Sequence, residues 1–210
     1  MIDFVDKCVV LAVSDYRDDD RLAKVLTAEH GLVSVLLRGV KKAKAKLKPF
    51  AQCFAVFDTR LVGRGGFLTP VEPMLIRDGF ALCSDLRVFA AASVAAEATL
   101  SAICDGEPHT DMFLEFLKLE KALYDYKEPY YQAAVFMTRI LEYAGYFREY
   151  AYDEMPKTPV RMLGYAQRRG YADAENADDL SRRAFKYVCA EYERAFDTEL
   201  KSAQSIDLYA

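Results

Sequence analysis

The pattern of apolar and polar positions divides the chain into a strand-rich first part and a helical second part. Short apolar runs separated by polar or glycine-containing turns fill the first 77 residues, and such spacing is typical of hairpin-linked strands. Gly31 lies in one of these turns, where glycine tolerates the positive φ that a tight reversal often needs. The predicted strands are Val5 to Val13, Leu22 to Thr27, Leu32 to Leu37, Cys53 to Leu61 and Phe67 to Ile76.

Five short, closely spaced strands predict a small barrel of the OB type. Pro70 and Pro73 restrict the ladder bonds of the last run, so we expect it to be an edge strand or a bulged strand. The sequence thus predicts an α+β protein, in which an N-terminal five-stranded OB-type β-barrel over residues 1–77 is followed by an all-α C-terminal domain over residues 78–210.

The pattern changes to helical spacing from residue 78 onward. Ser84 or Asp85 is expected to cap a long alanine-rich helix that runs to about Cys104. Thr110 is expected to cap the next helix after the break at Gly106 and Pro108. A third helix, apolar nearly all round, should be the most buried. The remaining predicted segments are this helix from Tyr130 to Ala144, with Pro129 before it and Gly145 after it, a loop from Asp153 to Pro159, and a helix from Arg182 to Phe196.

Charge is distributed unevenly between these two parts. The whole chain has a formal net charge of −4 at pH 7, which by itself argues against a polyanionic partner. Residues 1–77, however, contain 13 Lys and Arg against 9 Asp and Glu, whereas residues 78–210 contain 15 against 23. Because binding depends on the local field, this asymmetry indicates that the first part meets a polyanion and the second does not.

The most basic stretch, residues 38–48, lies between the third and fourth predicted strands. It has six cations and no acid. Lysines alternate there with small residues, so an extended loop would carry charge on both sides, which suits the tracking of a phosphate backbone. A solvated, flexible loop is the alternative interpretation of the same run. The candidate phosphate-binding residues are Arg38, Lys41, Lys42, Lys44, Lys46 and Lys48.

Aromatic residues near this basic segment are candidates for stacking on bases, since every base presents a π-face. Phe50, at the end of the segment, is the first candidate, and Tyr16 in the first turn is the next. Other aromatic residues are available, although most phenylalanines of a small barrel belong to its core; they are Phe54, Phe57 and Phe67. Three arginines in turns are further candidates for contact with nucleic acid, namely Arg17, Arg21 and Arg64.

The sequence gives little support for catalysis, metal binding or a membrane segment. His30 and His109 lie in separate predicted turns, without a Ser or Cys arrangement that suggests a nucleophile. The five cysteines are dispersed and lack the spacing of a zinc site, so we expect reduced thiols, no metal and no cofactor. No apolar run reaches the roughly 18 to 20 residues that cross a bilayer, and the acidic first residues are unlike a signal peptide. We therefore expect a non-enzymatic, cytoplasmic protein.

Several motifs resemble the bacterial RecO family of recombination mediators. The resemblance is most specific in residues 9–42, where a first turn, a glycine turn and an Arg-Gly-basic sequel appear in order. The residues that carry it there are Val10-Leu11, Asp15-Tyr16, Asp20-Arg21-Leu22, Leu26-Thr27, Glu29 to Val35 and Arg38 to Lys42. Similarity extends into the helical part at Asp85-Leu86, Ala91 to Ser93, Ala96-Glu97, Leu141 to Tyr146 and Leu200 to Ser202.

The resemblance implies a DNA-binding recombination mediator in DNA repair, located in the cytoplasm at the nucleoid. Such proteins bind single-stranded and double-stranded DNA, anneal complementary strands and cooperate with RecR to load RecA onto DNA covered by single-strand-binding protein. The helical domain is then expected to accept the acidic, apolar C-terminal tail of single-strand-binding protein, and the helix with Phe136, Arg139 and Ile140 is a candidate contributor. Many members carry a four-cysteine zinc module after the Gly-Tyr pair, but residues 146–170 contain no cysteine, so zinc is not carried over.

Two other classes of function share parts of this pattern. An OB-fold RNA-binding protein would have the same barrel and basic loop, but it would prefer structured RNA to single-stranded DNA. A protein-interaction adaptor would use the barrel without binding nucleic acid, and its partner complex would be insensitive to salt.

Overall fold

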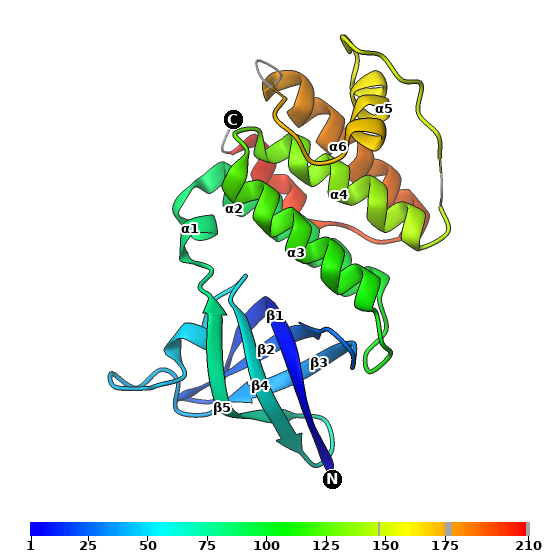
Figure 1. The fold of residues 1–210 in the computed structure, drawn as a ribbon. Helices are drawn as coiled ribbons and strands as arrows, with labels where there is room; N and C mark the ends of the chain where they lie inside the picture. Colours follow the sequence, from blue (N-terminus) through cyan, green and yellow to red (C-terminus); the bar gives the residue numbers. More distant parts are fainter. Residues whose placement is uncertain (147, 175–177, 209–210) are drawn as a thin grey trace. The chain divides into compact units, whose positions relative to one another are not determined.

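The computed structural model describes residues 1–146, 148–174 and 178–208, and the chain forms two compact units. The first unit comprises Met1–Ala81 and Ile103–Leu114, and the second comprises Leu82–Ala102 and Glu115–Ala210. Strands build most of the first unit and helices build the second, so the predicted α+β class is confirmed (Figure 1). The helices of the described part are each too short or too polar to cross a membrane.

Five strands of the first unit close into a barrel. They are β1 (Ile2–Tyr16), β2 (Asp20–Thr27), β3 (Leu32–Leu37), β4 (Val56–Gly63) and β5 (Leu68–Arg77). Their order around the barrel is β1-β2-β3-β5-β4. The long β1 is antiparallel to β4 along its first half and to β2 along its second half, and β3 pairs with β5 in parallel to complete the ring. The predicted OB-type barrel is therefore confirmed.

Alternate residues of the strands fill the inside of the barrel, as the two-residue period of a strand requires. Four residues from the β3–β4 connection join them, among them Val40 and Phe50, which are 3% and 6% exposed. The other members of the core are Cys8, Val10, Ala23, Val25, Val35, Leu37, Ala51, Ala55, Phe57, Leu61 and Leu68. This core therefore holds both ends of the basic segment, at Val40 and at Phe50.

Two strand details show how the backbone departs from a regular ladder. β5 is bulged, as predicted: its register against β4 shifts between Asp58 and Arg60, and Glu72 has a left-handed φ of 49°. β4 begins at Val56 and not at Cys53, because Phe54 has a left-handed φ of 67° and the chain turns there.

A segment from outside the strands, residues 103–110, binds to the β2–β3 hairpin; we call it the strap. Asp105 forms a parallel bridge with Leu32, and the Gly106 amide donates to the Leu32 carbonyl at 3.0 Å. The Lys24 ammonium lies 2.9 Å from the Asp105 carboxylate. The strap thus belongs to the barrel although it lies between two helices in the sequence.

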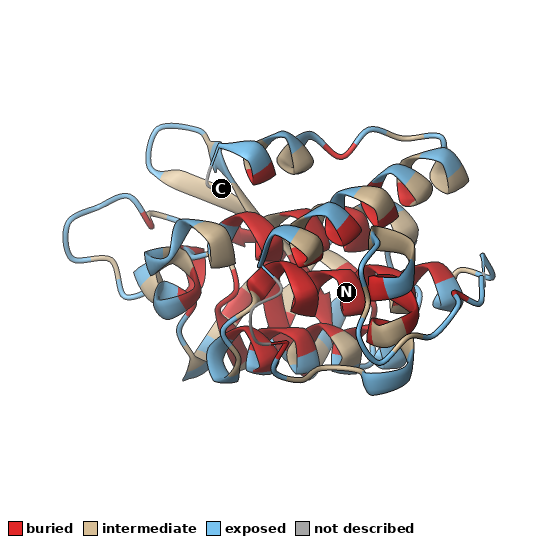
Figure 2. Ribbon diagram, turned by 90° about the horizontal axis from the view of Figure 1, so that it is seen from above, coloured by how far each residue is buried: buried red, intermediate tan, exposed pale blue. Residues whose placement is uncertain are grey.

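The second unit is a helical bundle around one buried helix. The helices of the chain are α1 (Phe80–Ser84), α2 (Leu86–Ala102), α3 (Thr110–Asp125), α4 (Pro129–Tyr143), α5 (Pro159–Arg169) and α6 (Asp178–Phe196), with a 3-10 turn, η2 (Lys201–Asp207). Twelve of the fifteen residues of α4 are buried, and α4 packs against α2, α5 and α6 (Figure 1). Figure 2 colours the buried residues of the chain red. The prediction that this helix is the most buried is confirmed.

Helix ends confirm one predicted cap and correct another. The Asp85 carboxylate accepts hydrogen bonds from the amides of Arg87 at 2.8 Å and Val88 at 3.3 Å, so Asp85 caps α2. Thr110, predicted to cap the next helix, is instead the first residue of α3, and its hydroxyl donates to the Ala28 carbonyl at 2.7 Å.

One helix, α5, was not predicted, since the prolines of residues 153–159 were interpreted as a loop. The loop ends at Thr158, whose side chain accepts from the Arg161 amide at 3.4 Å, and Pro159 occupies the first turn. Gly170, with a φ of 68°, ends the helix. These are ordinary start and stop signals of a helix, so the sequence was sufficient to predict α5.

Two glycines of the first unit allow a matched test of the strap. A Cβ at Gly31 (φ +70°) would lie 1.8 Å from the Glu107 carbonyl oxygen, whereas a Cβ at Gly65 (φ +80°) would meet nothing within 4 Å. Gly65→Ala should lower the free energy of unfolding by about 1–2 kcal/mol, the cost of a left-handed backbone. Gly31→Ala should cost about 1–3 kcal/mol more, because the strap must shift. Urea unfolding followed by circular dichroism measures both, and equal costs would contradict the strap contact.

Candidate nucleic-acid interface

The basic segment connects β3 to β4 and is held at both ends by the barrel core. Val40 near its start and Phe50 just after its end are buried, whereas all six cations between Arg38 and Lys48 are exposed. The last residues form a short 3-10 turn, η1 (Lys48–Ala51). Val40 and Phe50 point into the barrel core, and the cations between them lie on the outer surface.

The basic segment is bound to the β1–β2 turn through backbone groups. The Gly39 amide donates to the Asp20 carboxylate at 2.7 Å, and the Lys41 amide donates to the Asp19 carbonyl at 3.0 Å. Gly39 has a φ of 64°, a conformation that glycine adopts at no steric cost. These bonds bring Arg17, in the turn, close to the start of the basic segment, and the Lys41 ammonium donates to the Arg17 carbonyl at 3.4 Å.

Ion pairs between the two loops partly neutralise the cations. The Asp15 carboxylate lies 3.1 Å from both Lys41 and Arg21, and the Asp19 carboxylate lies 3.4 Å from Lys42. The bond from Lys41, and then that from Arg21, lowers the pKa of Asp15. These pairs are exposed, so each is worth little in stability, but they orient three of the candidate cations.

Other candidate cations form no ion pair within the described residues. They are Arg17, Arg38, Lys44, Lys46, Lys48 and Arg64. Of these, Lys48 donates to the Ala43 carbonyl at 3.0 Å, and the Arg17 guanidinium lies over the Tyr16 ring at 5.2 Å. Arg64 is exposed in the β4–β5 turn. Cations with no acidic partner are the ones that gain most from a phosphate.

The structure corrects the choice of stacking residue. Phe50 is 6% exposed and packs edge-on against Phe57, with ring centroids 5.1 Å apart. Its faces are closed to a base, so its proposed stacking role is wrong. Phe54 and Phe57 are also buried. Removing the Phe50 ring would instead leave a cavity and cost about 3–5 kcal/mol.

Two of the aromatic candidates lie together, the half-buried Tyr16 and the exposed Phe67. The rings of Tyr16 and Phe67 form an edge pair with centroids 5.6 Å apart, and Phe67 is 39% exposed. This pair joins the β1–β2 turn to the β4–β5 turn that carries Arg64. The two turns and the basic segment, three loops far apart in the sequence, therefore meet on one side of the barrel.

The histidine of the β2–β3 turn has a local structural role. Its Nδ1 lies 2.8 Å from the buried carboxylate of Asp6, which also accepts hydrogen bonds from the amides of Lys7 and Glu29. The His30 ring stacks on Phe4 with centroids 3.7 Å apart. The Asp6 carboxylate is thus occupied in holding the turn. Among the described residues, no group of three or more His, Cys, Asp or Glu is arranged to hold a metal ion.

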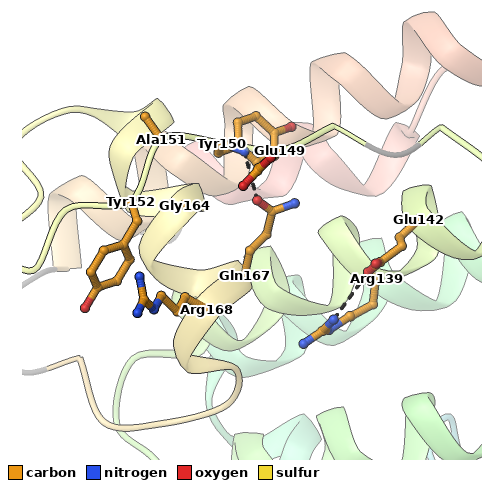
Figure 3. A pocket seen from close by; sticks show the side chains of 9 residues that line it. All are labelled: Arg139, Glu142, Glu149, Tyr150, Ala151, Tyr152, Gly164, Gln167 and Arg168. Atoms are coloured by element: carbon orange, nitrogen blue, oxygen red, sulfur yellow. Dashed lines mark hydrogen bonds and ion pairs between the residues drawn. The ribbon is translucent and has the colours of Figure 1, made fainter.

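A second candidate site is a groove of about 590 Å³ in the helical unit. One wall is α4, with Arg139 and Glu142, and the other is α5, with Gly164, Gln167 and Arg168, covered by residues 149–152. Figure 3 shows Gln167 accepting a hydrogen bond from the Tyr150 amide, at 3.0 Å, and Arg168 beside Tyr152.

The cations of this groove differ in their pairing. The Arg168 guanidinium lies over the Tyr152 ring at 4.4 Å and has no acidic partner within the described residues, whereas Arg139 pairs with Glu142 at 3.3 Å. Phe136 and Ile140, predicted with Arg139 as contributors, are fully buried and do not line the groove. The unpredicted α5 explains why sequence reasoning missed Arg168.

The contact between Lys41 and Asp15 gives a direct titration test. Since the pKa of Asp15 is lowered, its ion pairs hold at neutral pH and are lost as the pH falls through that lowered pKa. Lys41→Gln should move the pKa of Asp15 upward, toward its ordinary value, whereas Lys44→Gln should leave it unchanged. Carboxyl-detected NMR titration measures both variants. An unaltered Asp15 titration in Lys41→Gln would show that the basic segment does not contact the turn.

Comparison with known proteins shows similarity to proteins named for DNA repair and recombination. Residues 1–72 match the family model described as Recombination protein O N terminal. The chain is 29% identical over 140 residues, 66% of its length, to a protein of Desulfitobacterium hafniense named DNA repair protein RecO, and covers 50% of that protein. It is 33% identical over 107 residues, half of its length, to a protein of the same name from Anaeromyxobacter sp., and covers 42% of it.

A relative from Bacillus velezensis with the same name is 26% identical over 145 residues, 68% of the chain and 57% of that protein. The chain therefore spans about half the length of the curated relatives that it matches. The family match covers most of the barrel, including the basic segment. In residues 1–72 the chain is thus similar to the N-terminal domain of the RecO family, and it resembles proteins named DNA repair protein RecO over about half to two thirds of its length.

Proposed function

We propose that this protein is a non-enzymatic, DNA-binding recombination mediator that acts in DNA repair in the cytoplasm, at the nucleoid. In this proposal it binds single-stranded and double-stranded DNA, anneals complementary strands and, with RecR, helps to load RecA onto DNA covered by single-strand-binding protein. The family match and the names of the relatives support the repair role. The proposed domains are the OB-fold nucleic-acid-binding domain, residues 1–77, and the helical domain, residues 78–210.

One observation carries this proposal: the clustering of exposed cations where three loops of the barrel meet. Arg38, Lys44, Lys46 and Arg64 have no acidic partner within the described residues. Phosphates that bind such cations release their condensed counterions, which is the main source of affinity for non-specific binding to DNA. The net charge of −4 does not oppose this, because the acids of the chain lie mainly in residues 78–210.

The same surface accounts for strand annealing without covalent chemistry. Two DNA strands repel each other through their phosphates, and the basic segment carries exposed cations on a succession of turns, not on the extended loop that the sequence suggested. Screening by these cations lowers the repulsion while base pairing supplies the specificity. Catalytic residues are not required for such a role.

The groove of the helical unit is the proposed site for the tail of single-strand-binding protein. An acidic, apolar tail needs a pocket edged by a cation. Arg168 supplies a guanidinium with no acidic partner in the described part of the chain, and the Tyr152 ring beneath it supplies an apolar face. We assign no residues to RecR.

Neutralising the basic segment should weaken DNA binding roughly uniformly across sequences, because phosphate contacts carry no base information. Each lysine that meets a single strand should remove about 0.7 from the magnitude of the slope of log K against log salt. A variant with Lys41, Lys42, Lys44, Lys46 and Lys48 all changed to Gln should therefore lose up to about 3–4 of that slope. Fluorescence anisotropy over a salt series, with labelled single-stranded DNA, duplex DNA and RNA, measures this.

A charge-matched variant controls for the change in net charge. It replaces five exposed lysines of the helical unit, namely Lys118, Lys121, Lys127, Lys157 and Lys201. This control should keep the affinity and the slope of the unaltered protein. Both variants should remain folded, since substitution of an exposed residue usually changes stability by under about 0.5 kcal/mol. Equal losses in the two variants, or none in either, would refute the assignment of the basic segment. A preference for structured RNA would favour the RNA-binding alternative.

Binding of the tail peptide should depend on Arg168. Isothermal titration calorimetry with a synthetic C-terminal tail of single-strand-binding protein should give measurable heat, and Arg168→Glu should abolish it by replacing attraction with repulsion. Arg183→Glu on α6 is the matched control, because Arg183 is exposed and does not line the groove. The proposal for the groove fails if the peptide gives no heat, or if both variants bind it equally.

A further inference from the structure

The Tyr16–Phe67 pair is an unusual feature for the surface of a small barrel. Tyr16 ends β1 and Phe67 precedes β5, so the two rings come from turns about fifty residues apart in the sequence. Their centroids are 5.6 Å apart and their planes are inclined by 66°. Phe67 remains 39% exposed despite this contact. The Tyr16 ring is half-buried, so Phe67 supplies most of the open ring surface of the pair.

One cation contacts the pair, and others lie in the loops that the pair joins. The Arg17 guanidinium lies 5.2 Å from the centroid of the Tyr16 ring, and Arg17 has a left-handed φ of 55°, a conformation that non-glycine residues seldom adopt. Arg64 lies three residues before Phe67 and has no acidic partner within the described residues. On the other side, the Lys41 ammonium donates to the Arg17 carbonyl at 3.4 Å, which joins the basic segment to the same surface.

We propose that Tyr16 and Phe67 form a stacking platform for the unpaired bases of a single-stranded nucleic acid. Aromatic rings beside a phosphate-binding loop offer bases a π-face, and such stacking tolerates any sequence. A duplex hides its base faces within its own stack, so the platform makes the surface selective for single strands. This inference rests on the proposed function, because it names the form of nucleic acid that the same surface prefers.

The rings also have a structural role, since their contact joins two turns. That role alone predicts that their substitution lowers stability, with equal effects on single-stranded and duplex DNA. A stacking platform predicts a loss confined to single strands, because only these offer base faces. The two roles are therefore separable by comparing both forms of DNA under one set of conditions.

The test compares Phe67→Ala and Tyr16→Ala with Phe80→Ala, which removes a ring that is 69% exposed elsewhere in the first unit. Each platform variant should weaken binding of an oligothymidylate by about 5-fold to 100-fold, the range for loss of one stacked base. The salt slope should not change, because stacking releases few counterions. Affinity for a fully paired duplex of two separate strands should stay within about 2-fold of the unaltered protein. Phe80→Ala should change neither, and Phe67→Tyr should retain binding.

Two further measurements separate loss of stacking from loss of stability. If thermal unfolding shows that Phe67→Ala is unstable, Phe67→Leu replaces it, since leucine keeps apolar bulk but has no π-face. An oligonucleotide that contains 2-aminopurine should lose fluorescence on binding the unaltered protein and lose less on binding the variant. Equal losses on both forms of DNA, or an unchanged affinity for the oligothymidylate, would overturn the platform while the proposed function stands. Failure of the unaltered protein to bind any DNA would overturn both.

Discussion

The arrangement of the candidate interface depends on how the chain holds six mutually repelling cations in one place. The basic segment is fixed at its ends by Val40 and Phe50, which are buried in the barrel core. Its start is bound to the β1–β2 turn through Gly39 and Lys41. The energy that gathers the charges therefore comes from apolar burial and backbone hydrogen bonds, not from the charges themselves. Loss of either anchor would release the loop.

The acids of the β1–β2 turn give this arrangement a second property. Asp15 and Asp19 pair with Lys41, Lys42 and Arg21, so part of the basic surface is already neutralised when no ligand is bound. Lys44 and Lys46 have no such partner in the described chain. A phosphate backbone thus meets cations of two kinds, those that it binds directly and those for which it competes with an aspartate. The paired cations set orientation, and the others supply most of the gain in affinity.

The sequence was sufficient to predict those features that depend on local patterns of residues. The five strands follow from apolar runs and turns, and the basic segment follows from composition alone. The stacking residue could not be chosen from the sequence, because Phe50 and Phe67 both lie beside polar turns and only the closed barrel decides which ring points inward. The contact between Tyr16 and Phe67 is likewise long-range. The strap was missed because residues 103–110 contact β3 through backbone groups, which leave no side-chain pattern, and β2 through a long-range ion pair between Asp105 and Lys24. By contrast, α5 had recognisable signals in Thr158, Pro159 and Gly170.

In the proposed function, DNA binds where the β1–β2 turn, the basic segment and the β4–β5 turn meet. An NMR titration of the isotope-labelled chain with a short oligothymidylate tests it most directly, since amide shifts report contact residue by residue. The largest changes in amide shift should fall in residues 16–21, 38–48 and 64–67. The amide shifts of the strap should change little. Large shifts confined to the strap or to the helical unit, with these three loops unchanged, would contradict it.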